Sequence, residues 1–305
     1  NLRIIRMMIG GQRWGFQYSP YAYFNEHCIF LDQKHIPMII NQQTLINLVD
    51  IEKQLPEYFV GSNADLPIVG GSMLAHEHYQ GGRHIFPMMK AKIKKEIYFE
   101  KYPEVKAGIV DWPMSDLRLI SKNSLDLIDL GSKIINFWDH YSDPARQVKA
   151  FEGNSKHHTV TPIMHREGDR FILDLVLRDN NTSDEYPLGI FHPHAELWHI
   201  KKENIGLIEV MGRAILPGRL KGELEEVKKY LLNQDNRIAD SHLDWARKLK
   251  ADSQITKENV DSILQQALVE IFDQVLECAG VFKNNEDGEV GWQKFTDALI
   301  SEVDR

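Results

Sequence analysis

Apolar and polar residues alternate over residues 12–40, where aromatic side chains fill "RWGFQYSPYAYF" and branched ones fill "HCIFLDQKHIPMII". A period of two is typical of strands with one buried face, and Ser19-Pro20 marks a turn between them. The spacing becomes helical at "NQQTLINLVDIEKQL", where Asn41 or Thr44 can cap the first turn. The chain therefore begins with strands that lead into a helix.

Both periods recur further along. Residues 61–71 predict a loop, "SMLAHEHYQ" a strand and "KNSLDLIDLGSKIINFWDHY" a helix. Two strands joined by a hairpin turn at "GDRF" follow in "HHTVTPIMHREGDRFILDLVLRDN", and "GIFHPHAELWHI" predicts one more strand. Near the end, "ENVDSILQQALVEIFDQVLECAG" predicts a long helix that stops at Gly280.

A strand with the pattern His-x-His is thus expected twice, which suggests a diverged internal duplication. We expect an α+β fold of two similar halves, over residues 1–120 and 121–305, with mostly antiparallel sheets and flanking helices. The chain opens with Asn1 rather than Met and inside an apparent strand, so we also expect a missing N-terminal segment.

Composition narrows the classes of protein. A net charge of −8 disfavours nucleic acid and anionic lipid as partners. The sequence contains no run of eighteen apolar residues, so it predicts no membrane-spanning helix. Cys28 and Cys278 form no CxxC pair, so the spacing predicts neither a disulfide framework nor a cysteine-based zinc site. We expect reduced thiols and a cytoplasmic protein.

The densest chemistry lies in "IVGGSMLAHEHYQGGRHIFPMM". On a strand, His76, His78 and Gln80 would form one row, because alternate residues face the same side. The Gly70-Gly71-Ser72 turn before them can direct backbone N–H groups and a hydroxyl toward an anion, which suits phosphoryl chemistry. Two alternatives stay open from spacing alone: a metal site with a third ligand elsewhere, and histidines that are purely structural.

The string "NADLPIVGGSMLAHEHYQ" resembles the HxHxQ transferase branch of the histidine triad superfamily. With "QYSPYAYFNEHCIFLDQKHIPM", "DLVLRDNNTSDEYPLGIFHPH" and "KKENIGLIEVMGRAILP", it looks like the second class of bacterial galactose-1-phosphate uridylyltransferases. The resemblance covers nearly the whole chain, implies two histidine-triad-like halves, and agrees with a missing N-terminal segment. It implies transfer of UMP from UDP-glucose to galactose 1-phosphate, releasing glucose 1-phosphate and UDP-galactose, in a homodimer.

By this resemblance His78 is the nucleophile, and its second ring nitrogen should find an acceptor such as a backbone carbonyl of the motif. Gln80 would stabilise phosphoryl oxygens without acting as a base toward water, which favours transfer over hydrolysis. His76 would order the nucleophile strand. The other implied substrate-binding residues are Asn63, Gly70, Gly71, Ser72, Arg83, Asn25, Glu26 and Glu209.

His192 and His194, in "HPHAE", have no Gly-Gly-Ser turn before them and no Gln after them, so we expect no second active centre. The first class of these transferases binds a structural metal through a corresponding histidine pair. The resemblance therefore implies a structural zinc or iron here, although the transfer itself needs no cofactor. Two other functions stay open: a dinucleotide or nucleotide-sugar phosphorylase of the same branch, and a non-catalytic nucleotide-binding protein.

Overall fold

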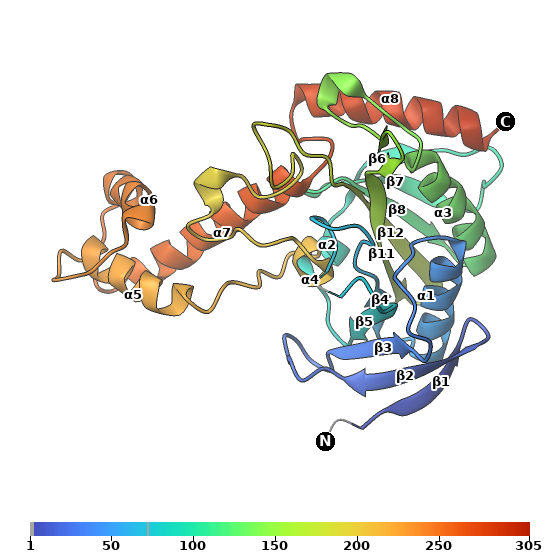
Figure 1. The fold of residues 1–305 in the computed structure, drawn as a ribbon, viewed down its shortest axis with the longest axis horizontal. Helices are drawn as coiled ribbons and strands as arrows, with labels where there is room; N and C mark the ends of the chain where they lie inside the picture. Colours follow the sequence, from blue (N-terminus) through green and yellow to red (C-terminus); the bar gives the residue numbers. More distant parts are fainter. Residues whose placement is uncertain (1–2, 72) are drawn as a thin grey trace.

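A single ten-stranded antiparallel sheet organises the chain, as the computed structural model shows for residues 3–71 and 73–305 (Figure 1). Its strand order is β1-β2-β3-β5-β4-β11-β12-β8-β7-β6. The strands are β1 (Ile5–Ile9), β2 (Gln12–Tyr18), β3 (Cys28–Asp32), β4 (Phe59–Gly61), β5 (His78–Gly82), β6 (Ile93–Ile97), β7 (Lys106–Val110), β8 (Asp116–Ser121), β11 (His158–Glu167) and β12 (Arg170–Asp179). A small separate hairpin pairs β9 (Phe151–Glu152) with β10 (Ser155–Lys156).

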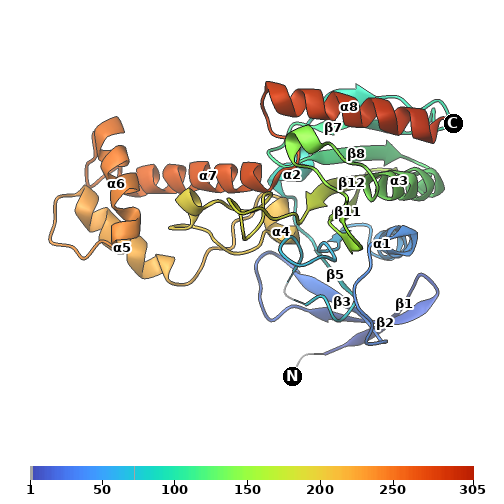
Figure 2. The same ribbon diagram turned by 45° about the horizontal axis from the view of Figure 1, so that its top comes forward.

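Helices cover both faces of the sheet. On one face α1 and α3 pack against the strands, and α8 lies on α3 (Figure 2). On the other face α2, α4 and the C-terminal end of α7 close a second apolar core. The helices are α1 (Gln42–Gln54), α2 (Pro87–Lys90), α3 (Ser124–Trp138), α4 (Leu207–Val210), α5 (Leu220–Leu231), α6 (Asp240–Asp252), α7 (Val260–Ala279) and α8 (Glu286–Val303), with 3-10 turns η1 (Pro144–Arg146) and η2 (Ala195–Leu197).

The helices α5, α6 and the first part of α7 project away from the sheet (Figure 1). They share a small core of their own, formed by Val227, Leu231, Ala246, Val260 and Leu264. Because α7 runs from this arm to the sheet, one helix joins the arm to the main core. No helix in the described part of the chain is long and apolar enough to cross a membrane.

The α+β class with a mostly antiparallel sheet and flanking helices is confirmed. Asn41 caps α1 through its side chain, α7 stops at Gly280, and β11 and β12 form the expected hairpin. Strands from residues 1–120 and from residues 121–305 join the same sheet, and β8 runs across that boundary. The division at residue 120 therefore stays a prediction.

Two expected strands differ in the structure. The ladder of β5 begins at His78, while Glu77 makes irregular backbone hydrogen bonds with Asp32 and Ile36. The strand expected over residues 189–200 is wrong, because that segment is a loop followed by η2. Pro193 has no N–H to give to a strand ladder, and its carbonyl instead accepts from the Trp198 indole.

Candidate active site

His78 opens β5 with its side chain buried, and it is held by one defined hydrogen bond. Its Nδ1–H donates to the backbone oxygen of His76 at 2.9 Å. Because a carbonyl only accepts, Nδ1 carries the proton and Nε2 keeps its lone pair. Burial lowers the pKa of His78, which favours this neutral form near pH 7. The prediction that one ring nitrogen of His78 finds a backbone carbonyl of the motif as its acceptor is confirmed.

Gln80 lies on the same face of β5 as His78, two residues further on. Its Oε1 is 3.0 Å from Nε2 of His27, a buried residue of the β2–β3 connection. The other ring nitrogen of His27 donates to the carbonyl of Tyr21. The sequence does not single out His27, because a histidine with no second histidine at i+2 carries no spacing signal.

His76 lies outside the strand, so the predicted row of three side chains on one strand face is wrong for this residue. Its Nε2–H donates to the backbone oxygen of Asp32 at 2.8 Å, and its ring packs on His35 with centroids 4.1 Å apart. These contacts tie the segment before β5 to the end of β3. Behind the site, the Tyr79 hydroxyl donates to Glu77 at 2.7 Å.

The glycine turn is built around Asn63. A Cβ at Gly71 would lie 2.7 Å from Nδ2 of Asn63, and one at Gly70 would lie 2.5 Å from the backbone oxygens of Ala64 and Leu66. Both positions therefore require glycine for close approach. Oδ1 of Asn63 accepts from the N–H of Leu207 at the start of α4, at 2.8 Å. Ser72, also predicted to contact phosphate, lies outside the described residues.

One pocket of about 480 Å³ brings together five of the predicted residues. Its lining includes Asn63, Gly70, Gly71, Gln80 and Glu209. They come from the loop after β4, from β5 and from α4, so the sheet and the segment after β12 meet here. A larger pocket of about 740 Å³, lined by residues of α3 and α8, contains none of the predicted site residues.

Glu209 is held in place by several donors. Its Oε1 pairs with Nζ of Lys201 at 2.7 Å and accepts from the N–H of Ile215, and its Oε2 accepts from the N–H of Gly206. Burial raises the pKa of Glu209, while Lys201 opposes that shift. The carboxylate thus fastens the loop around α4, and its role toward a sugar stays a prediction.

Asn25, Glu26 and Arg83 gather near the C-terminal end of β5 and do not line this pocket. The Arg83 guanidinium is 3.6 Å from Glu26, whose other oxygen accepts from the Tyr58 hydroxyl. Arg83 is 55% exposed, so its ion pair is weakly held in solvent. The structure brings these three residues close to one another, and their substrate contacts stay predictions.

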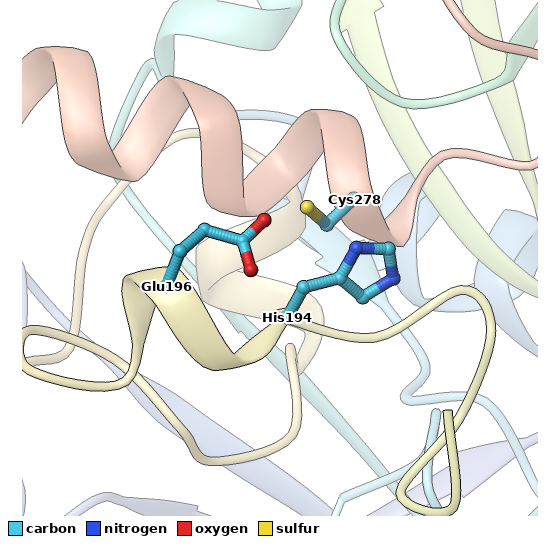
Figure 3. Close-up of side chains that lie close together, drawn as sticks. All are labelled: His194, Glu196 and Cys278. Carbon is cyan, nitrogen blue, oxygen red and sulfur yellow. The ribbon is translucent and has the colours of Figure 1, made fainter. Parts of the chain in front are cut away.

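His192 and His194 face different partners. Nδ1–H of His192 donates to the Pro193 carbonyl at 3.1 Å, and this ring is buried. His194 instead lies with Glu196 and with Cys278 of α7, and the three side chains point toward one another (Figure 3). His192 does not belong to this cluster.

Comparisons with known proteins give the family. Residues 51–247 match the family model of the galactose-1-phosphate uridyl transferase C-terminal domain, and the chain belongs to this family. It is 77% identical over 303 residues to a galactose-1-phosphate uridylyltransferase of Lactobacillus helveticus, covering 99% of this chain and 62% of that protein. A protein of the same name from Pediococcus pentosaceus is 60% identical over 299 residues, covering 98% of this chain and 61% of the relative. The chain thus spans somewhat under two thirds of the length of these relatives.

Among solved structures, a DUF4931 family protein from Bacillus cereus shares 10% sequence identity, with a TM-score of 0.38. That comparison covers 60% of this chain and 88% of the other.

Proposed function

We propose that this chain carries the nucleophile of a UDP-glucose–hexose-1-phosphate uridylyltransferase, which passes UMP through a uridylyl-histidine at His78 to galactose 1-phosphate. The observation that carries the proposal is the hydrogen bond from Nδ1–H of His78 to the His76 carbonyl. It leaves Nε2 unprotonated on the face of β5 that also presents Gln80 to the pocket. The names of the relatives support galactose 1-phosphate and uridylyl transfer, and UDP-glucose as the donor follows from the resemblance of the motifs.

In the first step the Nε2 lone pair attacks the α-phosphorus of UDP-glucose. A nitrogen–phosphorus bond forms and the phosphorus–oxygen bond to glucose 1-phosphate breaks, so the bonding pair leaves with that phosphate. The ring gains positive charge, which its Nδ1–H···O contact with His76 stabilises. In the second step a phosphate oxygen of galactose 1-phosphate attacks the same phosphorus, and the ring nitrogen leaves with its electron pair restored.

Gln80 would donate its amide N–H groups to the non-bridging phosphoryl oxygens. Leaving group and acceptor are both phosphates, whose second pKa is about 6, so no general acid is needed at this position. The transfer itself therefore requires no cofactor. The backbone at Gly70 and Gly71 would contact phosphate, and Asn63, whose side chain lies beside Gly71, would orient a phosphoryl oxygen.

His76 would order the nucleophile through its bond to Asp32. Contacts of Asn25 and Glu26 with uridine, of Arg83 with the hexose phosphate and of Glu209 with the sugar complete the proposed roles. We further propose a cytoplasmic homodimer, in which the division at residue 120 separates the two halves of the chain.

The test is covalent labelling. The protein is mixed with UDP-glucose labelled at the α-phosphate, denatured in alkali, and the label on the polypeptide is counted. His78→Ala should abolish labelling, because the nucleophile is gone. The control is His140→Ala, which removes an exposed histidine whose side chain donates to the Asn136 carbonyl and should label normally.

Base-stable, acid-labile label that galactose 1-phosphate discharges supports the transferase. Discharge by inorganic phosphate alone would identify a phosphorylase instead. A folded protein that binds UDP-glucose without acquiring label would contradict covalent catalysis and leave a binding function.

A further inference from the structure

We propose that His194, Glu196 and Cys278 form a binding site for one divalent transition metal of the zinc type. An imidazole nitrogen, a carboxylate oxygen and the Cys278 sulfur all lie within 4.8 Å of one another (Figure 3). Ligand atoms around tetrahedral zinc are about 3.5 Å apart, given bonds of about 2.0–2.3 Å. Binding would therefore draw these groups together by about 1 Å, which the exposed Glu196 side chain can accommodate.

The imidazole is already in the form that a metal requires. Nε2–H of His194 donates to the backbone oxygen of Ile190 at 2.9 Å, so the proton is on Nε2 and Nδ1 has the free lone pair. The ring stacks on Tyr186, with centroids 4.1 Å apart and planes inclined by 19°. Histidines that bind a metal commonly donate their other ring nitrogen to a backbone carbonyl in this way, which fixes the tautomer and the ring orientation.

The donor set selects the class of metal. Thiolate and imidazole favour zinc, cobalt or ferrous iron, whereas magnesium and calcium prefer sites made of oxygen alone. With the Cys278 thiol deprotonated on binding, one thiolate and one carboxylate balance the charge of a divalent ion. Three protein ligands also leave a fourth coordination position.

The surroundings leave room for that fourth position. The cluster lines a pocket of about 340 Å³ together with Gln274, Glu277 and Lys283. The ammonium group of Lys283 donates to the carbonyls of Glu277, Cys278 and Gly280, at 2.9, 2.9 and 2.8 Å. The three carbonyls at the end of α7 therefore fix the position of the Lys283 ammonium group.

A metal at this place would fasten η2 to the last turn of α7. The segment that carries His194 and Glu196 continues to Glu203 and Asn204, which line the pocket beside Gln80. The site would thus stabilise one wall of that pocket without taking part in chemistry. It differs from the pair implied by the resemblance, because Glu196 and the sequence-distant Cys278 take the place of His192.

The test uses the metal alone, so its outcome does not depend on uridylyl transfer. Chelator-treated protein is titrated with Zn²⁺ by calorimetry, with Mg²⁺ as a comparison, and Co²⁺ is then added to look for the absorption of a thiolate–cobalt bond. We expect one Zn²⁺ per chain, no comparable Mg²⁺ binding, and thiolate–cobalt absorption. Cys278→Ser should remove that absorption, and His194→Gln should weaken Zn²⁺ binding by at least about 10- to 100-fold.

Cys28→Ala is the matched control, because Cys28 is the other cysteine of the chain and is buried in β3. It should retain both the stoichiometry and the absorption. Circular dichroism of each variant separates loss of a ligand from loss of the fold, and Glu196→Gln provides a second, exposed substitution. Zn²⁺ binding that is absent from the folded protein, or unchanged in Cys278→Ser and His194→Gln, would overturn the proposal.

Discussion

Nε2 of His27, the residue just before β3, lies 3.0 Å from Oε1 of Gln80 on the neighbouring strand β5. Nδ1–H of His27 donates to the Tyr21 carbonyl, so its Nε2 can contact Gln80 in two ways. A neutral ring would accept from the amide N–H at Nε2, whereas an imidazolium would donate from Nε2 to the amide oxygen. The first arrangement leaves one amide N–H for a phosphoryl oxygen and the second leaves both, so in either arrangement His27 fixes the orientation of Gln80.

We expect His27→Ala to lower kcat by about 10- to 100-fold, the loss that follows when one oriented hydrogen bond of about 1–3 kcal/mol is removed. KM for UDP-glucose should change little, because Gln80 remains and only its orientation relaxes. His27→Gln, which can still donate to the amide oxygen, should recover part of kcat. Equal rises in KM with unchanged kcat would instead indicate a role in binding alone.

The proposed role of Gln80 can be tested by removing its side chain and by giving it a negative charge while keeping its shape. Gln80→Ala should reduce kcat by about 100- to 1000-fold, in the range measured for loss of one donor to a developing oxyanion. Gln80→Glu should be slower still, since a carboxylate repels the phosphoryl oxygens that the amide stabilises. Steady-state kinetics give kcat for both variants, and circular dichroism checks that each variant is folded. A Glu variant faster than the Ala variant would contradict the proposed role.

The rate of uridylylation should persist into mildly acidic solution. Burial lowers the pKa of His78 below the ordinary histidine value of about 6.5, and only the neutral ring is nucleophilic. The acid limb of single-turnover labelling should therefore have its midpoint below pH 6.5. Stability should also fall in acid. The unfolded state binds a proton at His78 more readily than the folded state, so the contribution of His78 to the free energy of unfolding decreases as pH drops below about 6.5. An acid limb centred above pH 6.5 would contradict this environment.

The glycine turn allows a graded stability test. Gly71→Ala would press a methyl group to 2.7 Å from Nδ2 of Asn63 and should cost about 1–3 kcal/mol. Gly70→Ala should cost more, because the obstacle is backbone oxygen at 2.5 Å. Gly218→Ala meets nothing within 4 Å and should lie within about 0.5 kcal/mol of the parent, which makes it the control. Denaturant unfolding would reveal this order, and equal effects would contradict it.

The sequence alone determined features that depend on near neighbours. The cap at Asn41, the end of α7 at Gly280 and the β11–β12 hairpin follow from local periodicity and turn chemistry. His78 and Gln80 share a face for the same reason, because successive side chains of a strand alternate. The link between His78 and the carbonyl of His76 is also local, and it was expected from what a nucleophilic imidazole needs.

Tertiary structure decided everything that joins distant segments. His27 reaches Gln80 only because β3 pairs with β5, and Asn63 reaches Leu207 only because α4 packs against the loop after β4. The alternation of "GIFHPHAELWHI" indicated a strand, yet Pro193 and the packing of Leu197 gave a loop and a 3-10 turn. Cys278 meets His194 at the end of a helix far along the chain. Contacts of this kind depend on which surfaces are buried against each other, and the pattern of residues along the chain does not specify that.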